Sequence, residues 1–166
     1  MKTNRLDGSR RSVPTSWNQS CFHNLEGEIQ LALAKPENAA QSFGAAAQEY
    51  PQVSSYAGLA RAHQALEQWD MAAREWEQVL YRKAEILQNG FPPDLAYAHF
   101  QLARTYRQMN KPDLALSQYK EILRMWQRAD ETPLLRDARR ESQLILKPPP
   151  PNDTAESRTP TPNHKN

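Results

Sequence analysis

The 166-residue sequence predicts an all-α fold: an antiparallel helix-pair solenoid of about three repeats, closed by a C-terminal capping helix. An internal repeat relates the middle of the chain to its later part at a fixed offset. Prolines fall where helices should begin or end, and the middle is rich in helix-forming alanine, leucine, glutamine, glutamate and arginine. With only 5 glycines, a turn-rich β fold is excluded.

The repeat is clearest in two segments that lie 43 residues apart, YAGLARAH at 56–63 and HFQLARTY at 99–106. Each carries Leu-Ala three residues after an aromatic or histidine side chain. The same offset relates the helices that follow, in which an alanine precedes an aromatic by four residues, at Ala72 and Trp76 and at Ala115 and Tyr119. We predict that the alanines permit close helix packing and that the aromatics fill the space between units.

This pattern resembles the tetratricopeptide repeat (TPR), in which W-x2-L-G-x2-Y is followed by A-x3-F. Ala60 and Ala103 take the glycine position. A weaker unit precedes these two: Gly27 takes the small position, and Ala39 and Phe43 lie 33 residues before their counterparts Ala72 and Trp76. The resemblance covers about residues 25–129 and implies a scaffold that binds proteins or peptides.

The predicted domain is residues 21–147, flanked by a disordered segment at 1–20 and a disordered, proline-rich tail at 148–166. Trp17 and Phe22 are expected to anchor the start of the fold. The units and the capping helix are predicted at 21–52, 53–95, 96–129 and 133–146.

The 43-residue offset exceeds the usual TPR period of about 34 residues. We therefore expect the second helix of the middle unit to continue past Leu80 to about Gln88, with a cap at Asn89-Gly90. In the capping helix, Thr132-Pro133 is a predicted N-cap. Its expected buried residues are Leu134, Leu135, Ala138 and Leu144, and its expected solvated residues are Arg136, Asp137, Arg139, Arg140 and Glu141.

Catalytic, cofactor and metal sites are not expected. The four histidines and the single Cys21 form none of the common zinc or nucleophile motifs. His63 and His99 fall on repeat positions that usually pack, and Trp69, Trp76 and Trp126 are predicted core residues. A net charge of +2 gives no reason to expect nucleic acid, and no apolar stretch reaches the ~20 residues of a membrane span.

The resemblance implies that the first helix of each unit lines a concave groove. The groove residues that it implies are Arg61, Gln64, Tyr97, Phe100, Arg104, Arg107 and Gln108, with Ser54, Ala57 and Ala65 beside them. Arg61 and Arg104 occupy the same slot, and two arginines on one face can bind a carboxylate. The hypothesis is a groove for an acidic segment or a free C-terminus; the alternative is that the arginines form only a solvated face.

A narrower resemblance links the stretch from Tyr97 to Glu141 to the C-terminal arrays of bacterial multidomain regulators with kinase or winged-helix domains. It implies a regulatory or docking module in the cytoplasm that needs no cofactor, and the single cysteine suits a reducing compartment. There are two alternatives to this function. The chain could self-associate as a homodimer, or it could be the tail of a larger regulator.

Overall fold

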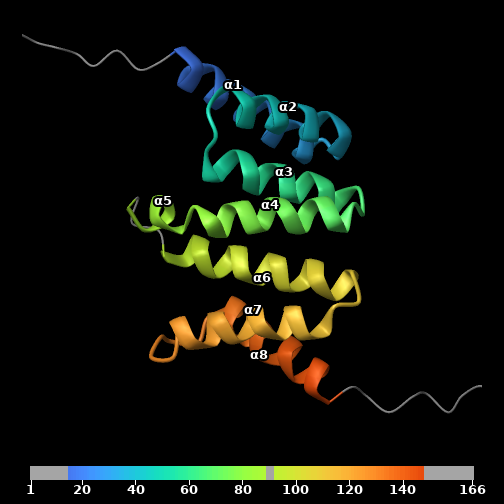
Figure 1. The fold of residues 1–166 in the computed structure, drawn as a ribbon, viewed down its shortest axis with the longest axis vertical. Coiled ribbons are helices and arrows are strands. Elements are labelled where there is room, and N and C mark those ends of the chain that lie inside the picture. The colour runs from blue at the N-terminus through green and yellow to red at the C-terminus, as the bar shows by residue number, and fades with distance from the viewer. Residues whose placement is uncertain (1–14, 89–91, 148–166) are drawn as a thin grey trace, which may run out of the picture.

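A computed structural model describes residues 15–88 and 92–147, and the described chain is built from α-helices (Figure 1). The helices are α1 (Thr15–Ala32), α2 (Pro36–Glu49), α3 (Val53–Ala65), α4 (Trp69–Tyr81), α5 (Lys83–Gln88), α6 (Pro92–Gln108), α7 (Pro112–Met125) and α8 (Pro133–Leu146).

Three antiparallel pairs follow one another along the long axis of the molecule: α1 with α2, α3 with α4, and α6 with α7 (Figure 1). Each first helix also packs on the pair before it, and α8 closes the array against α7 and α6. The predicted helix-pair solenoid with a terminal helix is confirmed. Proline starts α2, α7 and α8, as expected where the first turn needs no N–H donor.

The turn inside each pair has the same geometry in all three units. A left-handed residue with φ near 55° ends the first helix at Ala34, Glu67 and Asn110. The next residue then donates its N–H to the carbonyl five residues back, at 2.9 Å in each unit. This is a Schellman-type helix end, and its recurrence shows that the weak first repeat is a true unit.

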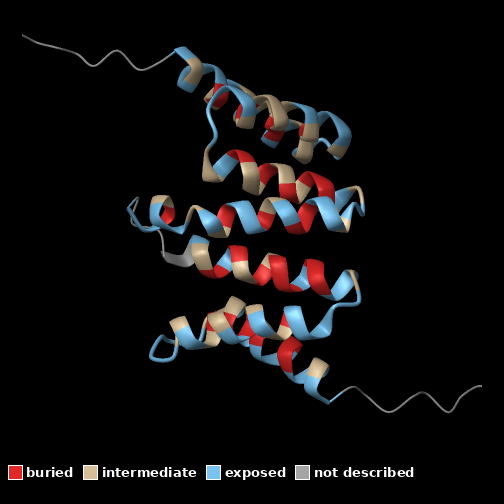
Figure 2. Ribbon diagram, viewed as in Figure 1, coloured by how far each residue is buried: buried red, intermediate tan, exposed pale blue. Residues whose placement is uncertain are grey.

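The core lies between neighbouring pairs, where the faces that meet are buried (Figure 2). Trp76 is 1% exposed, and Tyr119 and Phe43 are fully buried, as the repeat pattern predicted. The alanines at the small positions are also fully buried. One large core spans the second and third units with α8, whereas a smaller one, centred on Phe43, joins the first unit to α3.

The start of the fold differs from the expectation. Helix α1 begins at Thr15, so residues 15–20 are helical rather than disordered. Ser20 is fully buried and donates its hydroxyl to the carbonyls of Ala46 (2.9 Å) and Tyr50 (3.0 Å). Trp17 and Phe22, in contrast, are exposed, so the anchor is a small polar residue and not an aromatic. The expectations for residues 1–14 and 148–166 lie outside the described residues.

The long second helix of the middle unit is interrupted. Helicity reaches Gln88 as predicted, but α4 ends at Tyr81 and α5 begins at Lys83. The break lets Glu85 accept a hydrogen bond from the Val53 N–H at the start of α3 (3.2 Å) and buries Ile86 in the core. The expected Asn89-Gly90 cap lies outside the described residues.

Helix α8 starts as predicted, with the Thr132 hydroxyl accepting from the Leu135 N–H at 3.2 Å. Leu135 and Ala138 are buried, but Leu144 is exposed. The prediction that Glu141 is solvated was wrong, because this carboxylate is 5% exposed and paired to three side chains of other helices.

Candidate functional site

A hollow on the described chain lies between α3 and α6. It has a volume of about 670 Å³. Among the predicted groove residues, it is lined by Ser54, Ala57, Arg61 and Tyr97. Its other lining residues come from α1, α4, α5 and the ends of α3 and α6: Glu28, Gln52, Val53, Trp76, Val79, Glu85, Ile86, Asp94 and Ala98.

Arg61 is held inside this groove by its own chain. Its guanidinium forms an ion pair with Glu28 of α1 and also lies 6.0 Å from the centre of the Phe43 ring. Glu28, Glu85 and Asp94 are the acidic lining residues; Glu28 pairs with Arg61 and Glu85 with Arg82 (3.5 Å), so Asp94 leaves this part of the groove net negative. The expectation of a free arginine that awaits an acidic ligand therefore does not describe Arg61.

An aromatic wall forms the α6 side of the groove. Tyr97 is 39% exposed and packs edge-on against Trp76, with ring centres 6.0 Å apart. The Trp76 Nε1 is buried without a hydrogen-bond partner in the described part of the chain. The exposed phenol of Tyr97 offers flat apolar surface and one hydroxyl group to a ligand.

Two other predicted groove residues serve the fold. Phe100 was expected in the groove but is 5% exposed, packing on Tyr119 with ring centres 6.0 Å apart. Gln64 donates its amide to the Thr105 hydroxyl at 2.9 Å, which bridges α3 and α6. Helical periodicity alone cannot separate residues that face the groove from residues that face the neighbouring helix. Phe100 and Gln64 face the neighbouring helices.

The remaining predicted residues meet around Glu141. Arg104 donates Nε (3.0 Å) and Nη2 (2.6 Å) to Glu141 Oε1, while Arg107 Nη1 and the Tyr119 hydroxyl each donate to Oε2 at 2.6 Å. Burial by itself raises the pKa of the Glu141 carboxyl, but the hydrogen bonds from Arg104, Tyr119 and Arg107 outweigh it and hold the pKa below its ordinary value. This node, hereafter the Glu141 node, fixes α8 to α6 and α7.

Around the Glu141 node, a smaller hollow of about 360 Å³ is lined by Arg104, Arg107, Gln108 and Glu141. The two guanidinium groups outnumber the one carboxylate, so this end carries a net positive charge. The side chains of Arg104 and Arg107 remain 44% and 38% exposed, which leaves N–H donors facing solvent. The concave face is thus polarised: negative around Glu28, Glu85 and Asp94, positive around the node.

Within residues 15–88 and 92–147, no three or more His, Cys, Asp or Glu side chains are grouped so that they could hold a metal ion. His63 is buried, as predicted, and burial lowers the pKa of its imidazole. The His99 Nδ1 lies 2.7 Å from the Gln118 Oε1 and donates to it, because an amide oxygen only accepts hydrogen bonds. None of the described helices combines the length and the apolar character that a membrane crossing requires.

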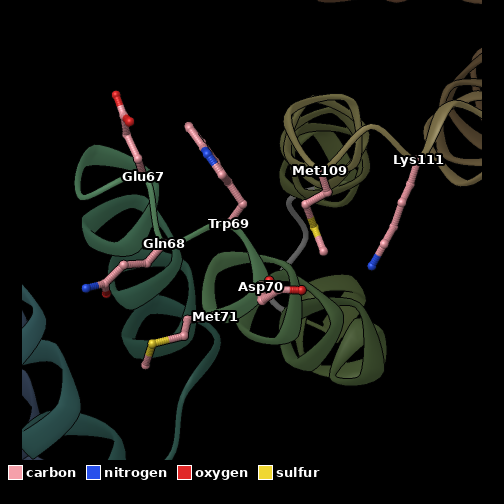
Figure 3. Close-up of a pocket in the computed structure, with 7 residues that line it drawn as sticks. All are labelled: Glu67, Gln68, Trp69, Asp70, Met71, Met109 and Lys111. Carbon is pink, nitrogen blue, oxygen red and sulfur yellow. The ribbon is translucent and has the colours of Figure 1, made fainter.

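A further hollow of about 500 Å³ lies at the opposite edge, beside the α3–α4 turn (Figure 3). Its lining residues are Glu67, Gln68, Trp69, Asp70, Met71, Met109 and Lys111. Glu67 and Trp69 point to one side, whereas Gln68 and Met71 point away from them (Figure 3). Because the side chains do not converge on one point, this hollow lacks the arrangement of a ligand site.

The stacked helix pairs define the described part of the molecule as a helical-repeat solenoid. Residues 52–128 match the family model described as tetratricopeptide repeat. Among solved structures, the N-terminal domain of stress-induced protein-1 (STI-1) from C. elegans is similar, with 12% identity and a TM-score of 0.66 over 77% of this chain and 98% of that chain. No curated protein matches the sequence significantly.

These comparisons confirm the fold class and the family resemblance of the central units. Tetratricopeptide repeats generally serve as scaffolds that bind other proteins or peptides, and they are typically not catalytic. The predicted class of function is supported at that level.

Proposed function

We propose that this protein is a scaffold that binds a peptide segment of a partner protein in the concave groove between α3 and α6. The observation that carries the proposal is the open hollow of about 670 Å³, walled by the exposed Tyr97 and by Arg61 and Ala57 of α3. Pockets of this size with an aromatic surface and a few polar groups are typical of ligand sites.

The charges on the concave face favour one direction for the bound segment. Its acidic part, or its C-terminal carboxylate, lies toward Arg104 and Arg107, whose free N–H donors suit a carboxylate. Its neutral or basic part lies toward Glu85 and Asp94. The hypothesis of an acidic partner is therefore kept for the Glu141 node, where Gln108 adds an amide, and not for Arg61.

A selection from displayed random peptides with free C-termini tests this proposal. The best peptide is synthesised with a fluorescent label and titrated against the purified chain and its variants. Tyr97→Ala and Arg61→Ala should each weaken binding about tenfold, equivalent to ~1.4 kcal/mol. The control is Arg74→Ala, which changes an exposed arginine on α4 outside the groove.

Unchanged affinity in both groove variants would overturn the proposal, as would an equal loss in the Arg74 control. Circular dichroism of each variant separates a binding defect from a folding defect. Peptides selected without any acidic residue near the C-terminus would refute the proposed direction while leaving the groove itself intact.

We further propose that the scaffold acts as a regulatory or docking module in the cytoplasm. This rests on the sequence resemblance to arrays in bacterial regulators and on the single cysteine, Cys21, which suits a reducing compartment. Self-association is the alternative function; it is compatible with peptide binding because it would use a different surface, the outer face of α1.

A further inference from the structure

Helix α1 and the residue that follows it carry an apolar stripe that no other part of the described chain covers. The stripe consists of Phe22 (66% exposed), Leu25 (62%), Ile29 (50%) and Leu33 (57%). Their spacing of three, four and four residues places them along one side of the helix. Large apolar residues are seldom exposed together on a soluble monomer without a role in contact.

The same positions are built differently in the next first helix. Ser55, Gly58 and Ala62 of α3 lie 33 residues after Phe22, Leu25 and Ile29, and all three are buried. They are small because the preceding unit presses a bulky ring against them: a Cβ on Gly58 would lie 2.5 Å from the Phe43 Cζ. The stripe therefore does not have the shape that receives another repeat, which would bring its own aromatic to this place.

The other end of the array is finished in the usual way for a solenoid. The outer face of α8 exposes Arg136, Arg140, Gln143 and Lys147, together with two leucines near its C-terminal end, Leu144 and Leu146. A terminal helix with a polar outer face keeps a repeat array soluble. The exposed surface of α8 is thus mainly polar, whereas α1 carries a continuous line of four large apolar residues.

We propose that the stripe is a contact between two copies of this chain, in which α1 of one copy packs antiparallel on α1 of its partner. The stripe matches itself in this arrangement. With the two-fold axis near Gly27, Phe22 faces the partner's Leu33 and Leu25 faces the partner's Ile29. A contact of this kind uses one patch twice and closes without forming fibres.

The charges beside the stripe permit the approach of two copies. Glu26 and Glu28 flank it; Glu28 forms an ion pair with Arg61 of its own chain, and Glu26 lies 3.5 Å from the His23 Nδ1. Because the Glu28 charge is met inside one copy, the Glu28 side chains of two copies repel less than free carboxylates would.

The size of the stripe sets the strength of the dimer. Four half-exposed side chains present roughly 400 Å², within the range of the largest patches on monomers. Two copies would bury about twice that from these residues, near the lower limit of ~1,000 Å² for a specific interface. We therefore expect a weak, reversible dimer with a dissociation constant in the micromolar range.

Sedimentation equilibrium of the full chain between about 5 and 500 µM tests the proposal. The wild type should shift from monomer to dimer across this range, and Leu25→Glu should stay monomeric. Leu146→Glu is the matched control because Leu146 is 63% exposed and lies on α8 at the opposite end. Ile29→Lys gives a second disruption of opposite charge, should Leu25→Glu fold poorly.

A monomer at every concentration would overturn the proposal. So would a dimer that survives both α1 variants, or one that Leu146→Glu abolishes, since the last result would place α8 in the contact. None of these outcomes bears on peptide binding, because the stripe lies outside the groove.

Disulfide crosslinking tests the antiparallel direction. Across an axis at Gly27 the two copies of Cys21 are separated by about 18 Å along the helices, too far for a disulfide. Mild oxidation should leave the wild type uncrosslinked, whereas Cys21→Ser combined with Glu26→Cys should crosslink near the axis. Efficient crosslinking through Cys21 would show a parallel contact and refute the arrangement.

Discussion

A methyl group added at position 58 tests how the first two units pack. Gly58 lies in α3 against Phe43, whose ring is fully buried. A Cβ there would lie 2.5 Å from Phe43 Cζ and nearer still to Cδ1 and Cε1. Carbon atoms in contact normally keep about 3.5–4.0 Å, so the ring would have to move by more than 1 Å.

The ring is also confined at its tip. There Gly27 of α1 approaches so closely that a Cβ on it would be 2.7 Å from the same Cζ. Overpacking of a core typically costs about 1–3 kcal/mol, and a ring held from two sides belongs at the upper end. Alanine gains ~1 kcal/mol over glycine as a helix former, so we expect Gly58→Ala to lose about 2 kcal/mol net.

Urea denaturation followed by circular dichroism measures this difference. Gly44→Ala is the control: Gly44 is also in a helix interior, but its Cβ would meet nothing within 4 Å. It should gain about 0.5–1 kcal/mol. If Gly58→Ala stabilised the protein as much as Gly44→Ala does, the proposed packing of Phe43 between two glycines would be wrong.

Three further predictions concern stability. Trp76→Ala should cost about 3–5 kcal/mol in urea denaturation, because Trp76 fills the space between the second and third units. Ala34→Gly should add about 1 kcal/mol by relieving its left-handed φ of 54°, and an unchanged midpoint would contradict that. Glu141→Gln should cost about 2 kcal/mol at pH 7. Since the pKa of Glu141 is lowered by folding, its contribution is complete above about pH 4.5 and is lost as pH falls further. The Gln variant should lack this part of the acid dependence.

Much of the fold follows from local patterns in the sequence. The Ala-x3-aromatic pattern placed Trp76 and Tyr119 correctly in the core, and proline and threonine marked the start of α8. These features can be predicted from the sequence because each depends on neighbours within a few turns of one helix. Even the weak first unit could be found from the spacing of Ala39 and Phe43 alone.

The parts that sequence reasoning missed depend on partners far along the chain. Glu141 looks like a solvated residue on a charged helix, but it is buried by Arg104 and Tyr119, which lie 37 and 22 residues away. Arg61 likewise finds Glu28 across 33 residues. One local signal was available for α1: the spacing of Phe22, Leu25, Ile29 and Leu33 already describes an apolar stripe, and only burial shows that nothing in the described chain covers it.

The most direct test of the peptide-binding account is an NMR titration of the labelled chain with the selected peptide. The account predicts that amide shifts concentrate on Ala57, Arg61 and Tyr97, then extend toward Arg104 and Arg107, while α4 residues such as Arg74 stay unchanged. Shifts confined to the convex helices, or to the outer face of α1, would contradict it.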